Sequence, residues 1–196
     1  MHPSRRLLDA AEPGIELVAG WLYGEAPEAE PRIQVQCLGT VLEGPERIRM
    51  GTDAPRAYTF LWPDLKEAPA GDLVLDVQLR FGDEEPVSRV LTVARVPRLA
   101  ERLEALEAPL PKEAPALELR TLAARRKLLE SLATGSTEET DFPAARLLGE
   151  AEAMATAAST GEAWFGPEAR GQHWLRLPVG RRASASVRLL VPSTYD

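Results

Sequence analysis

Few residues in this sequence are of the types that commonly do chemistry. The 196 residues include one cysteine, Cys37, and two histidines, His2, in a terminus expected to fray, and His173. The common zinc frameworks need about four Cys or His ligands, so this set excludes them, and a single cysteine also excludes an intrachain disulfide. Cys37 shares the apolar parity of Ile33 and Val35, so we predict a buried, unreactive thiol.

The sequence patterns of the common enzyme sites are also missing. A serine hydrolase places its nucleophile in a Gly-x-Ser-x-Gly pentapeptide, which does not occur, and Ser136 lies in a predicted helix-ending loop with no histidine nearby. His173 lies beside Trp174 in a predicted strand, where a structural or surface role is favoured. No carboxylate pair, calcium loop or phosphate loop has the required spacing, and residues 83–85 are predicted to be a solvated turn. We therefore predict no catalytic residue, metal ligand or cofactor.

Composition and charge exclude further classes. With 44% apolar and 27% charged residues the chain is expected to fold, and its net charge of −7 argues against nucleic-acid and anionic-membrane partners. Residues 161–196 alone are net basic, with five basic and three acidic side chains. We expect a cytoplasmic protein as written, because no apolar run fits a signal peptide or a membrane span. A missing upstream signal would make it exported.

Residues 14–96 alternate apolar and polar residues with a period of two. The alternation is clearest over residues 73–81, and turn residues separate about six such runs. This pattern predicts an antiparallel, immunoglobulin-like β-sandwich. The name describes architecture only, since the Cys pair of antibody domains is missing.

After Pro97 the apolar period becomes helical, which predicts a segment of three helices over residues 97–160. The first helix begins at Pro97, the second covers about 116–132, and the third has Asp141 as its N-cap. The basic run 125–127 is predicted to form the solvent-exposed face of the second helix. The third helix has a broad stripe of alanine, leucine and methionine that we expect to pack closely against a neighbour.

Residues 161–196 are predicted to be an aromatic linker followed by a β-hairpin over 172–192. The fold class is therefore α+β: an N-terminal sandwich, three helices and a C-terminal hairpin. A lone hairpin is marginally stable and needs a larger sheet to join. The candidate docking or interface residues are Trp164, Phe165, Trp174, Leu189 and Val191. For Trp164 and Phe165, an anchor that pins the linker is favoured over a ligand platform.

The end of the chain resembles a known family. A Trp-containing strand, a short turn and then Ser-Val-Arg-Leu-Leu-Val-Pro-Ser-Thr-Tyr-Asp at 186–196 resemble the opening of the α/β-hydrolase domain in bacterial esterases and peptidases of the polyhydroxyalkanoate-depolymerase and dienelactone-hydrolase type. The likeness covers about the last 25 residues. It implies an accessory region that carries the first hydrolase strands, with the catalytic triad of the family falling beyond Asp196.

The leading hypothesis is a non-catalytic accessory region of an esterase-like hydrolase, which positions or shields the catalytic domain. Its expected partners are that domain or a second copy bound through the hairpin. The alternative is a self-contained carbohydrate- or protein-binding sandwich, in which Trp21 and Trp62 would stack on sugar rings. Both tryptophans share the parity of core residues, which favours burial instead. Substrate, oligomeric state and whether the chain is a complete gene product stay open.

Overall fold

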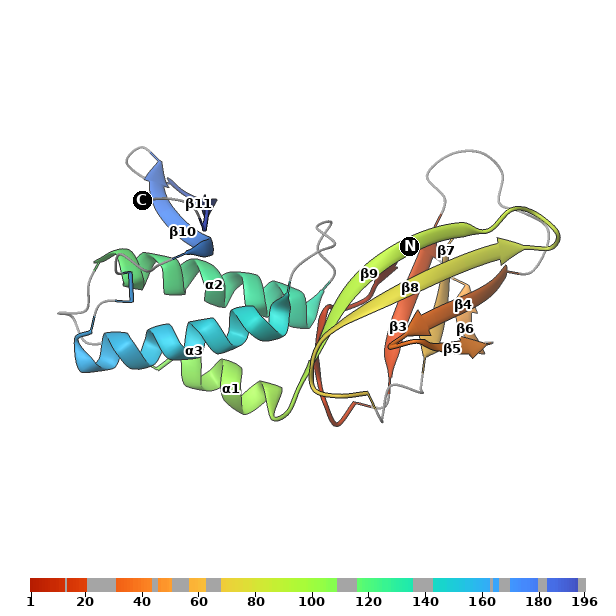
Figure 1. The fold of residues 1–196 in the computed structure, drawn as a ribbon, viewed down its shortest axis with the longest axis horizontal. Coiled ribbons are helices and arrows are strands. Elements are labelled where there is room, and N and C mark those ends of the chain that lie inside the picture. The colour runs from red at the N-terminus through yellow and green to blue at the C-terminus, as the bar shows by residue number, and fades with distance from the viewer. Residues whose placement is uncertain are drawn as a thin grey trace. The chain divides into compact units, whose positions relative to one another are not determined.

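The computed structural model describes residues 1–12, 14–20, 31–43, 46–50, 57–62, 68–108, 116–135, 143–162, 164–165, 170–179 and 183–193. Within these ranges the protein is a mixed α+β chain in which nine strands precede three helices and two further strands (Figure 1). The chain divides into two units, Met1–Leu99 with Ser131–Ala145, and Ala100–Glu130 with Arg146–Asp196. The three stretches 14–96, 97–160 and 161–196 stay a prediction from the sequence.

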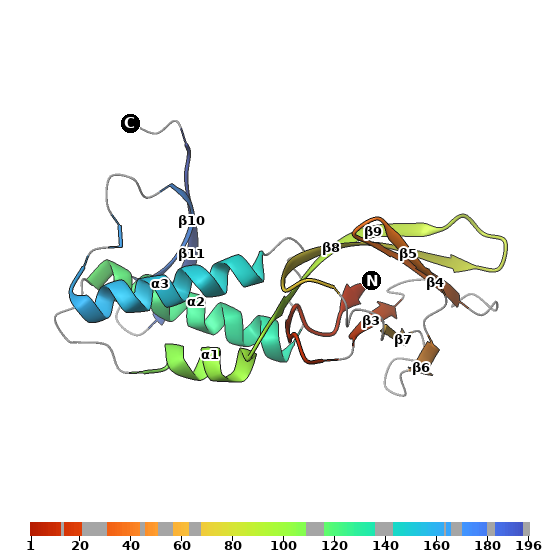
Figure 2. The ribbon, with the colours of Figure 1, turned by 60° about the horizontal axis from the view of Figure 1, so that its bottom comes forward.

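The first unit contains two sheets. One has the order β1-β3-β7-β6, with β1 His2–Pro3, β3 Ile15–Gly20, β7 Ala57–Trp62 and β6 Glu46–Met50. The other has the order β2-β9-β8-β4-β5, with β2 Leu7–Asp9, β9 Val87–Val96, β8 Gly71–Phe81, β4 Pro31–Cys37 and β5 Thr40–Glu43. Neighbouring strands are antiparallel except β2 and β9, which run parallel. Figure 2 shows the two sheets as separate layers.

One hydrophobic core lies between these sheets. Ile15 and Leu17 of β3 share a buried cluster with the inward residues of β4, β8 and β9. The alternation predicted for residues 73–81 is confirmed, since every second side chain of β8 is buried. The burial predicted for Cys37 is also confirmed, and burial raises the pKa of its thiol.

The N-terminal residues belong to this core, in contrast to the frayed end expected at His2. Two short strands, β1 and β2, pair with β3 and β9, and Leu7 and Leu8 are buried. The Arg6 N–H donates to the Leu132 carbonyl oxygen at 2.9 Å, and the Arg6 carbonyl accepts from the Ala94 N–H at 2.7 Å. These long-range bonds explain why a short polar segment is ordered.

The helices are α1 Leu99–Leu106, α2 Ala116–Thr134 and α3 Ala144–Thr160. The predicted start of the first helix at Pro97 is wrong, because Arg98 has a left-handed φ of 55° and separates Pro97 from the helix. The Leu99 N–H instead donates to Asp9 Oδ2 of β2 at 2.7 Å, which caps α1 from a distant part of the chain.

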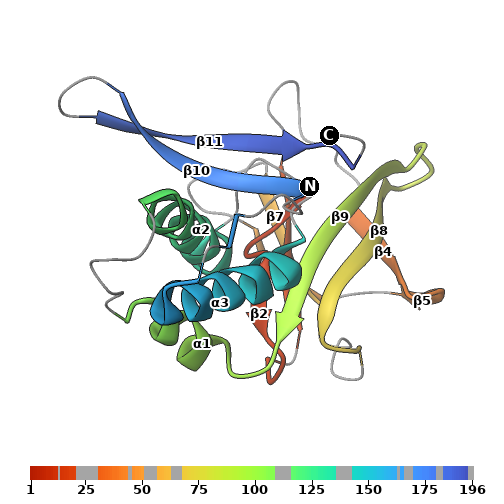
Figure 3. The ribbon, with the colours of Figure 1, turned by 60° about the vertical axis from the view of Figure 1, so that its left-hand side comes forward.

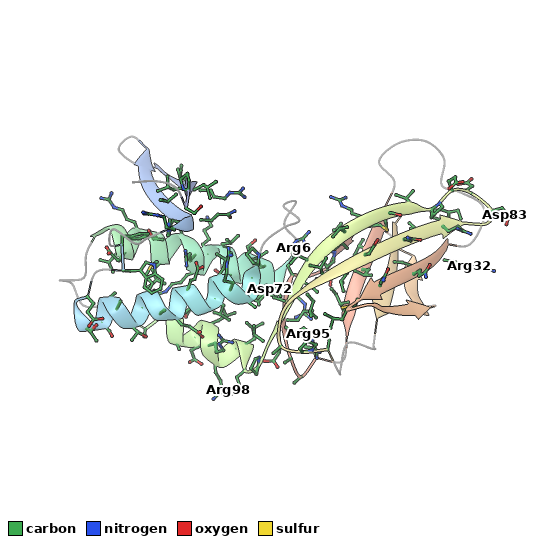
Figure 4. The ribbon with its side chains drawn as sticks, in the orientation of Figure 1. Arg6, Arg32, Asp72, Asp83, Arg95 and Arg98 are labelled. Atoms are coloured by element: carbon green, nitrogen blue, oxygen red, sulfur yellow. The ribbon has the colours of Figure 1, made fainter. Side chains whose placement is uncertain are left out.

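A second strand carboxylate caps α3 in the same way. The Ala145 N–H donates to Asp72 Oδ1 of β8 at 2.8 Å, while the predicted cap, Asp141, lies outside the described residues. Figure 4 labels Asp72 on β8, and Asp83 at the far end of that strand, where residues 83–85 are exposed as predicted. A carboxylate at a helix N-terminus is favoured by both the unpaired N–H groups and the helix dipole.

Apolar stripes and ion pairs connect the helices. The predicted stripe of α3 is confirmed, with its large members and most of its alanines buried: Ala144, Leu147, Leu148, Ala151, Met154 and Ala158. In the second unit, Arg102 of α1 forms a bidentate pair with Glu152 of α3, at 2.6 and 2.7 Å. This geometry is the strongest that a surface pair adopts.

The predicted C-terminal hairpin is confirmed. Strands β10, Gly171–Val179, and β11, Ala183–Val191, pair antiparallel over nine residues each, from Gly171 opposite Val191 to Val179 opposite Ala183. Among the described strands they form a separate two-stranded sheet.

Candidate docking surface

Strand β11 exposes large apolar side chains on both of its faces. Val187 and Leu189 point to one face and are 38% and 44% exposed, while Leu190 points to the other and is 62% exposed. The face of Leu190 is otherwise polar or charged on β11, with Ser184, Ser186 and Arg188, while the face of Val187 and Leu189 is aliphatic. Contiguous apolar patches mark interaction sites more often than single exposed residues do, which makes the neighbouring Val187, Leu189 and Leu190 a candidate surface.

The parity of the hairpin shows which backbone groups point outward. Proline has no N–H, so the opposed pair Pro178–Ser184 cannot exchange two hydrogen bonds and is a non-hydrogen-bonded pair. Such pairs alternate with hydrogen-bonded ones along an antiparallel ladder. Ser186 and Leu190, which share the parity of Ser184, therefore point their backbone N–H and C=O groups away from β10.

A side chain of α2 binds one backbone carbonyl on the outer edge of β10. The carbonyl oxygen of Gln172, which has the outward parity of Pro178, accepts a hydrogen bond from Arg125 Nη2 of α2 at 3.3 Å. Figure 3 shows the hairpin next to α2, with β10 drawn nearer the helices. Since Pro178 also lacks a donor, the edge of β10 is a poor template for a further strand, and the edge of β11 is the one that remains suitable.

Arg125 is a buried cation, which corrects the prediction that the run 125–127 faces solvent. Its side chain is fully buried, and Nη1 lies 2.7 Å from Glu150 Oε2 of α3. Lys127 is exposed and Arg126 is half-buried, so the run straddles the helix surface. Burial lowers the pKa of Arg125, and the neighbouring Glu150 carboxylate opposes that shift.

The signal for Arg125 was present in its spacing. Arg125 follows the buried Leu122 by three residues and precedes the buried Leu129 by four, which places it on the inward face of α2. Glu118 and Thr121 fall on the same face and are buried as well. The prediction treated residues 125–127 as one charged, solvent-exposed run, whereas the helical spacing places Arg125 on the buried face.

His173 lies at the base of the hairpin, directly opposite Leu189, and is buried. Its ring packs edge-on against Phe165, with centroids 5.0 Å apart and an interplanar angle of 73°. Neither ring nitrogen has a hydrogen-bond partner in the described part of the chain. Burial chiefly, and then the Arg125 cation, lower the pKa of His173, while Glu150 opposes them. The imidazole is therefore a structural, neutral side chain at neutral pH.

The aromatic linker is held by its backbone. The N–H groups of Trp164 and Phe165 both donate to Glu118 Oε1, at 3.1 and 3.2 Å. Glu118 is a buried side chain on α2, and these two donors supply hydrogen bonds to its buried oxygen. Both aromatic side chains are half-buried. These hydrogen bonds bind the residues before the hairpin to the same helix that binds β10.

The structure brings together three of the five candidate interface residues, Trp164, Phe165 and Leu189, around Glu118 and His173. Phe165 packs against the His173 ring, Leu189 is the strand partner of His173, and the backbone N–H groups of Trp164 and Phe165 both bind Glu118. Val191 lies half-buried at the end of β11, and Trp174 is a β10 residue whose side chain lies outside the described residues. The two tryptophans of the sugar-stacking alternative also fall outside them, Trp21 entirely and Trp62 in its side chain.

The described part of the chain was also compared with the requirements of a metal centre and of a membrane-spanning helix. No group of three or more His, Cys, Asp and Glu residues in the described ranges is arranged to hold a metal ion. None of the helices described is both long and apolar enough to cross a membrane.

Comparisons with known proteins add little. No family model matches the sequence, and neither does any curated protein. The structure of CopC from Methylosinus trichosporium OB3b matches with 20% sequence identity and a TM-score of 0.32, over 48% of this chain and 86% of CopC. A TM-score of this size does not establish a shared fold.

Proposed function

We propose that this protein is a non-catalytic accessory region that binds an α/β-hydrolase-type catalytic domain by adding strand β11 to that domain's sheet. The observation that carries the proposal is the outer edge of β11. It combines outward backbone groups at Ser184, Ser186 and Leu190 with aliphatic side chains on both faces. Strand addition uses these two features, since main-chain hydrogen bonds supply affinity and alternate side chains supply specificity.

The packing beneath β10 supports this role. Arg125 binds the backbone of β10, and the buried His173 ring packs against Phe165, so the hairpin is anchored on one side. Anchoring one strand fixes the orientation of the other, and a preorganised strand loses less entropy when it binds. We choose a hydrolase catalytic domain as the partner because residues 186–196 resemble the first strands of a hydrolase sheet. The immunoglobulin-like name for the two sheets of the first unit belongs to the same proposal.

The first test asks whether the purified chain has hydrolase activity. The purified chain is expected to hydrolyse p-nitrophenyl acetate no faster than a buffer control with the same total imidazole and thiol. A saturable rate that a serine-directed reagent abolishes would make the chain an enzyme and overturn the proposal.

The second test addresses binding. The coding sequence downstream of codon 196 is expected to contain a Gly-x-Ser-x-Gly elbow, and its product, expressed separately, is expected to bind this chain. Ser186→Pro removes an outward N–H from β11 and is expected to weaken binding at least tenfold. The matched variant Ser186→Ala keeps that N–H and is expected to bind normally. Equal binding by the two variants would exclude addition at this edge.

A further inference from the structure

The edge of β11 is also complementary to itself. We propose that two copies of the chain pair β11 with β11 antiparallel, about a two-fold axis at Val187, and that this pairing closes the docking edge. The inference rests on the proposed function, because it assigns a regulation to the same strand. The pair would form a four-stranded sheet in the order β10-β11-β11-β10.

The two-fold register follows from the backbone parity. The outward residues of one copy must face the outward residues of the other to exchange hydrogen bonds. A two-fold axis at Val187, the middle residue of β11, meets this condition and pairs all nine residues of the strand. The resulting cross-strand pairs are Ala183–Val191, Ser184–Leu190, Ala185–Leu189, Ser186–Arg188 and Val187–Val187.

Side-chain size and charge favour this register. The N-terminal half of β11 has small residues and its C-terminal half has large ones, so every large side chain except Val187 at the axis lies opposite a small one. The one charged residue of the strand, Arg188, lies opposite Ser186 of the second copy. Opposed pairs without like charges are the stable ones in an antiparallel sheet.

The neighbouring symmetric registers are less favourable. Moving the axis to Arg188 places the two guanidinium groups directly opposite each other, which destabilises the pair. Moving the axis to Ser186 leaves Leu190 and Val191 without strand residues of the second copy opposite them. The axis at Val187 therefore gives the longest ladder without a like-charge pair.

The partner proposed for this edge is a second copy of the chain, because the small N-terminal half of β11 is complementary to its large C-terminal half. Closed two-fold interfaces are the commonest in homo-oligomers, and they need a self-complementary patch. Val187 of both copies would meet at the axis, with Leu189 on either side, and cover side chains that are 38% and 44% exposed in one chain. Since a hydrolase sheet would use the same edge, dimer and complex exclude each other.

Disulfide trapping tests the register in the full chain. Single cysteines are placed along β11 in a Cys37→Ala background, and each protein is oxidised gently. Val187→Cys is expected to link to itself, because opposed Cβ atoms of a non-hydrogen-bonded pair lie about 4.5–5.5 Å apart, close to disulfide range. Ala185→Cys and Leu189→Cys are expected to link only when mixed. The Cys37→Ala protein without an added cysteine is the control.

Other linking patterns would contradict the proposal. Self-linking of Ser186→Cys or Arg188→Cys at the expense of Val187→Cys would place the axis elsewhere. Sedimentation of the unmodified chain gives an independent readout: we expect a monomer–dimer equilibrium that Ser186→Pro shifts to monomer and Ser186→Ala leaves unchanged. A strict monomer at millimolar concentration would overturn the inference.

The failure of this inference and that of the proposed function are separable. Hydrolase-domain binding that depends on the Ser186 N–H, by a chain that never dimerises, would leave the proposed function standing and remove the dimer. A β11 dimer that does not bind the downstream product would support the dimer and overturn the proposed function. If both occur, adding the downstream product is expected to dissolve the dimer and to reduce Val187→Cys linking.

Discussion

Two long antiparallel pairs in this protein, β8–β9 and β10–β11, have similar apolar content and different surroundings. Every second residue of β8 from Leu73 to Phe81 is buried, and the second sheet shares that core. On β11 the aliphatic residues Val187, Leu189 and Leu190 stay exposed. The β8–β9 pair also exposes Val74 and Val90 on its outer side, so the difference between the two pairs is the second sheet that covers the inner side of β8–β9.

The largest expected effect tests the buried side of this comparison. Leu75→Ala removes a fully buried side chain from β8 and is expected to lower the free energy of unfolding by about 3 kcal/mol. Val74→Ala, at an adjacent position that is 59% exposed, is expected to cost less than about 0.5 kcal/mol. Urea denaturation measures both, and Leu189→Ala on β11 is expected to behave like the second. Similar losses for Leu75→Ala and Leu189→Ala would remove the contrast.

A somewhat smaller effect tests the anchor of the hairpin. Arg125→Ala removes the ion pair with Glu150 and the hydrogen bond to Gln172, and is expected to cost about 2–3 kcal/mol in unfolding free energy. Lys127→Ala, on the exposed face of the same helix, is expected to cost less than about 0.5 kcal/mol. Amide exchange in β10 is expected to increase in the first variant alone. Unchanged β10 protection in Arg125→Ala would show that α2 does not anchor the hairpin.

An effect of about 1 kcal/mol is expected at the cap of α1. Asp9→Ala removes the carboxylate that accepts from the Leu99 and Ala11 N–H groups, and loss of an N-cap commonly costs that much. These N–H groups, Ala11 first, lower the pKa of Asp9, so its contribution is present above its unfolded pKa of about 3.9 and is lost as pH falls through the lower folded value. Denaturation of Asp9→Ala and of the exposed-tip control Asp83→Ala, at pH 7 and pH 3, measures this. An equal loss for both variants at pH 7 would contradict the cap.

The smallest expected effect is a pH dependence in the second unit. Because burial and Arg125 lower the pKa of His173, the folded unit binds its proton less well than the unfolded chain does. Stability is therefore complete above an unfolded pKa of about 6.5 and declines as pH falls from there toward the folded value. His173→Phe keeps the edge-on contact with Phe165 and is expected to lose less stability between pH 7.5 and 5. Identical pH profiles would show that His173 does not titrate in this range.

The sequence predicted what its own periodicity encodes. Alternation located β8, two apolar runs about a Gly-containing turn located the hairpin, and helical phase located three helices with their apolar stripes. It missed the caps, because Asp9 and Asp72 are far in sequence from Leu99 and Ala145. Strands β1 and β2 are too short to show a period and are held by long-range pairing.

The candidate docking surface was predictable only in part. The candidate residues Leu189 and Val191 place the surface on β11, and Pro178 is visible in the sequence. That α2 binds the edge of β10 depends on the bond from Arg125 to Gln172, which no local pattern reports. The buried carboxylate Glu118 was missed for the same reason: its partners are backbone N–H groups of a distant linker.

Residue-resolved amide exchange along β11 tests the central claim most directly. In a dilute sample of monomer, the N–H groups of Ser184, Ser186 and Leu190 are expected to exchange fast, while those of Ala185, Val187 and Leu189 are expected to be protected by β10. Slow exchange of both sets in the monomer would mean that the chain already covers this edge itself, and would contradict its assignment as the docking strand.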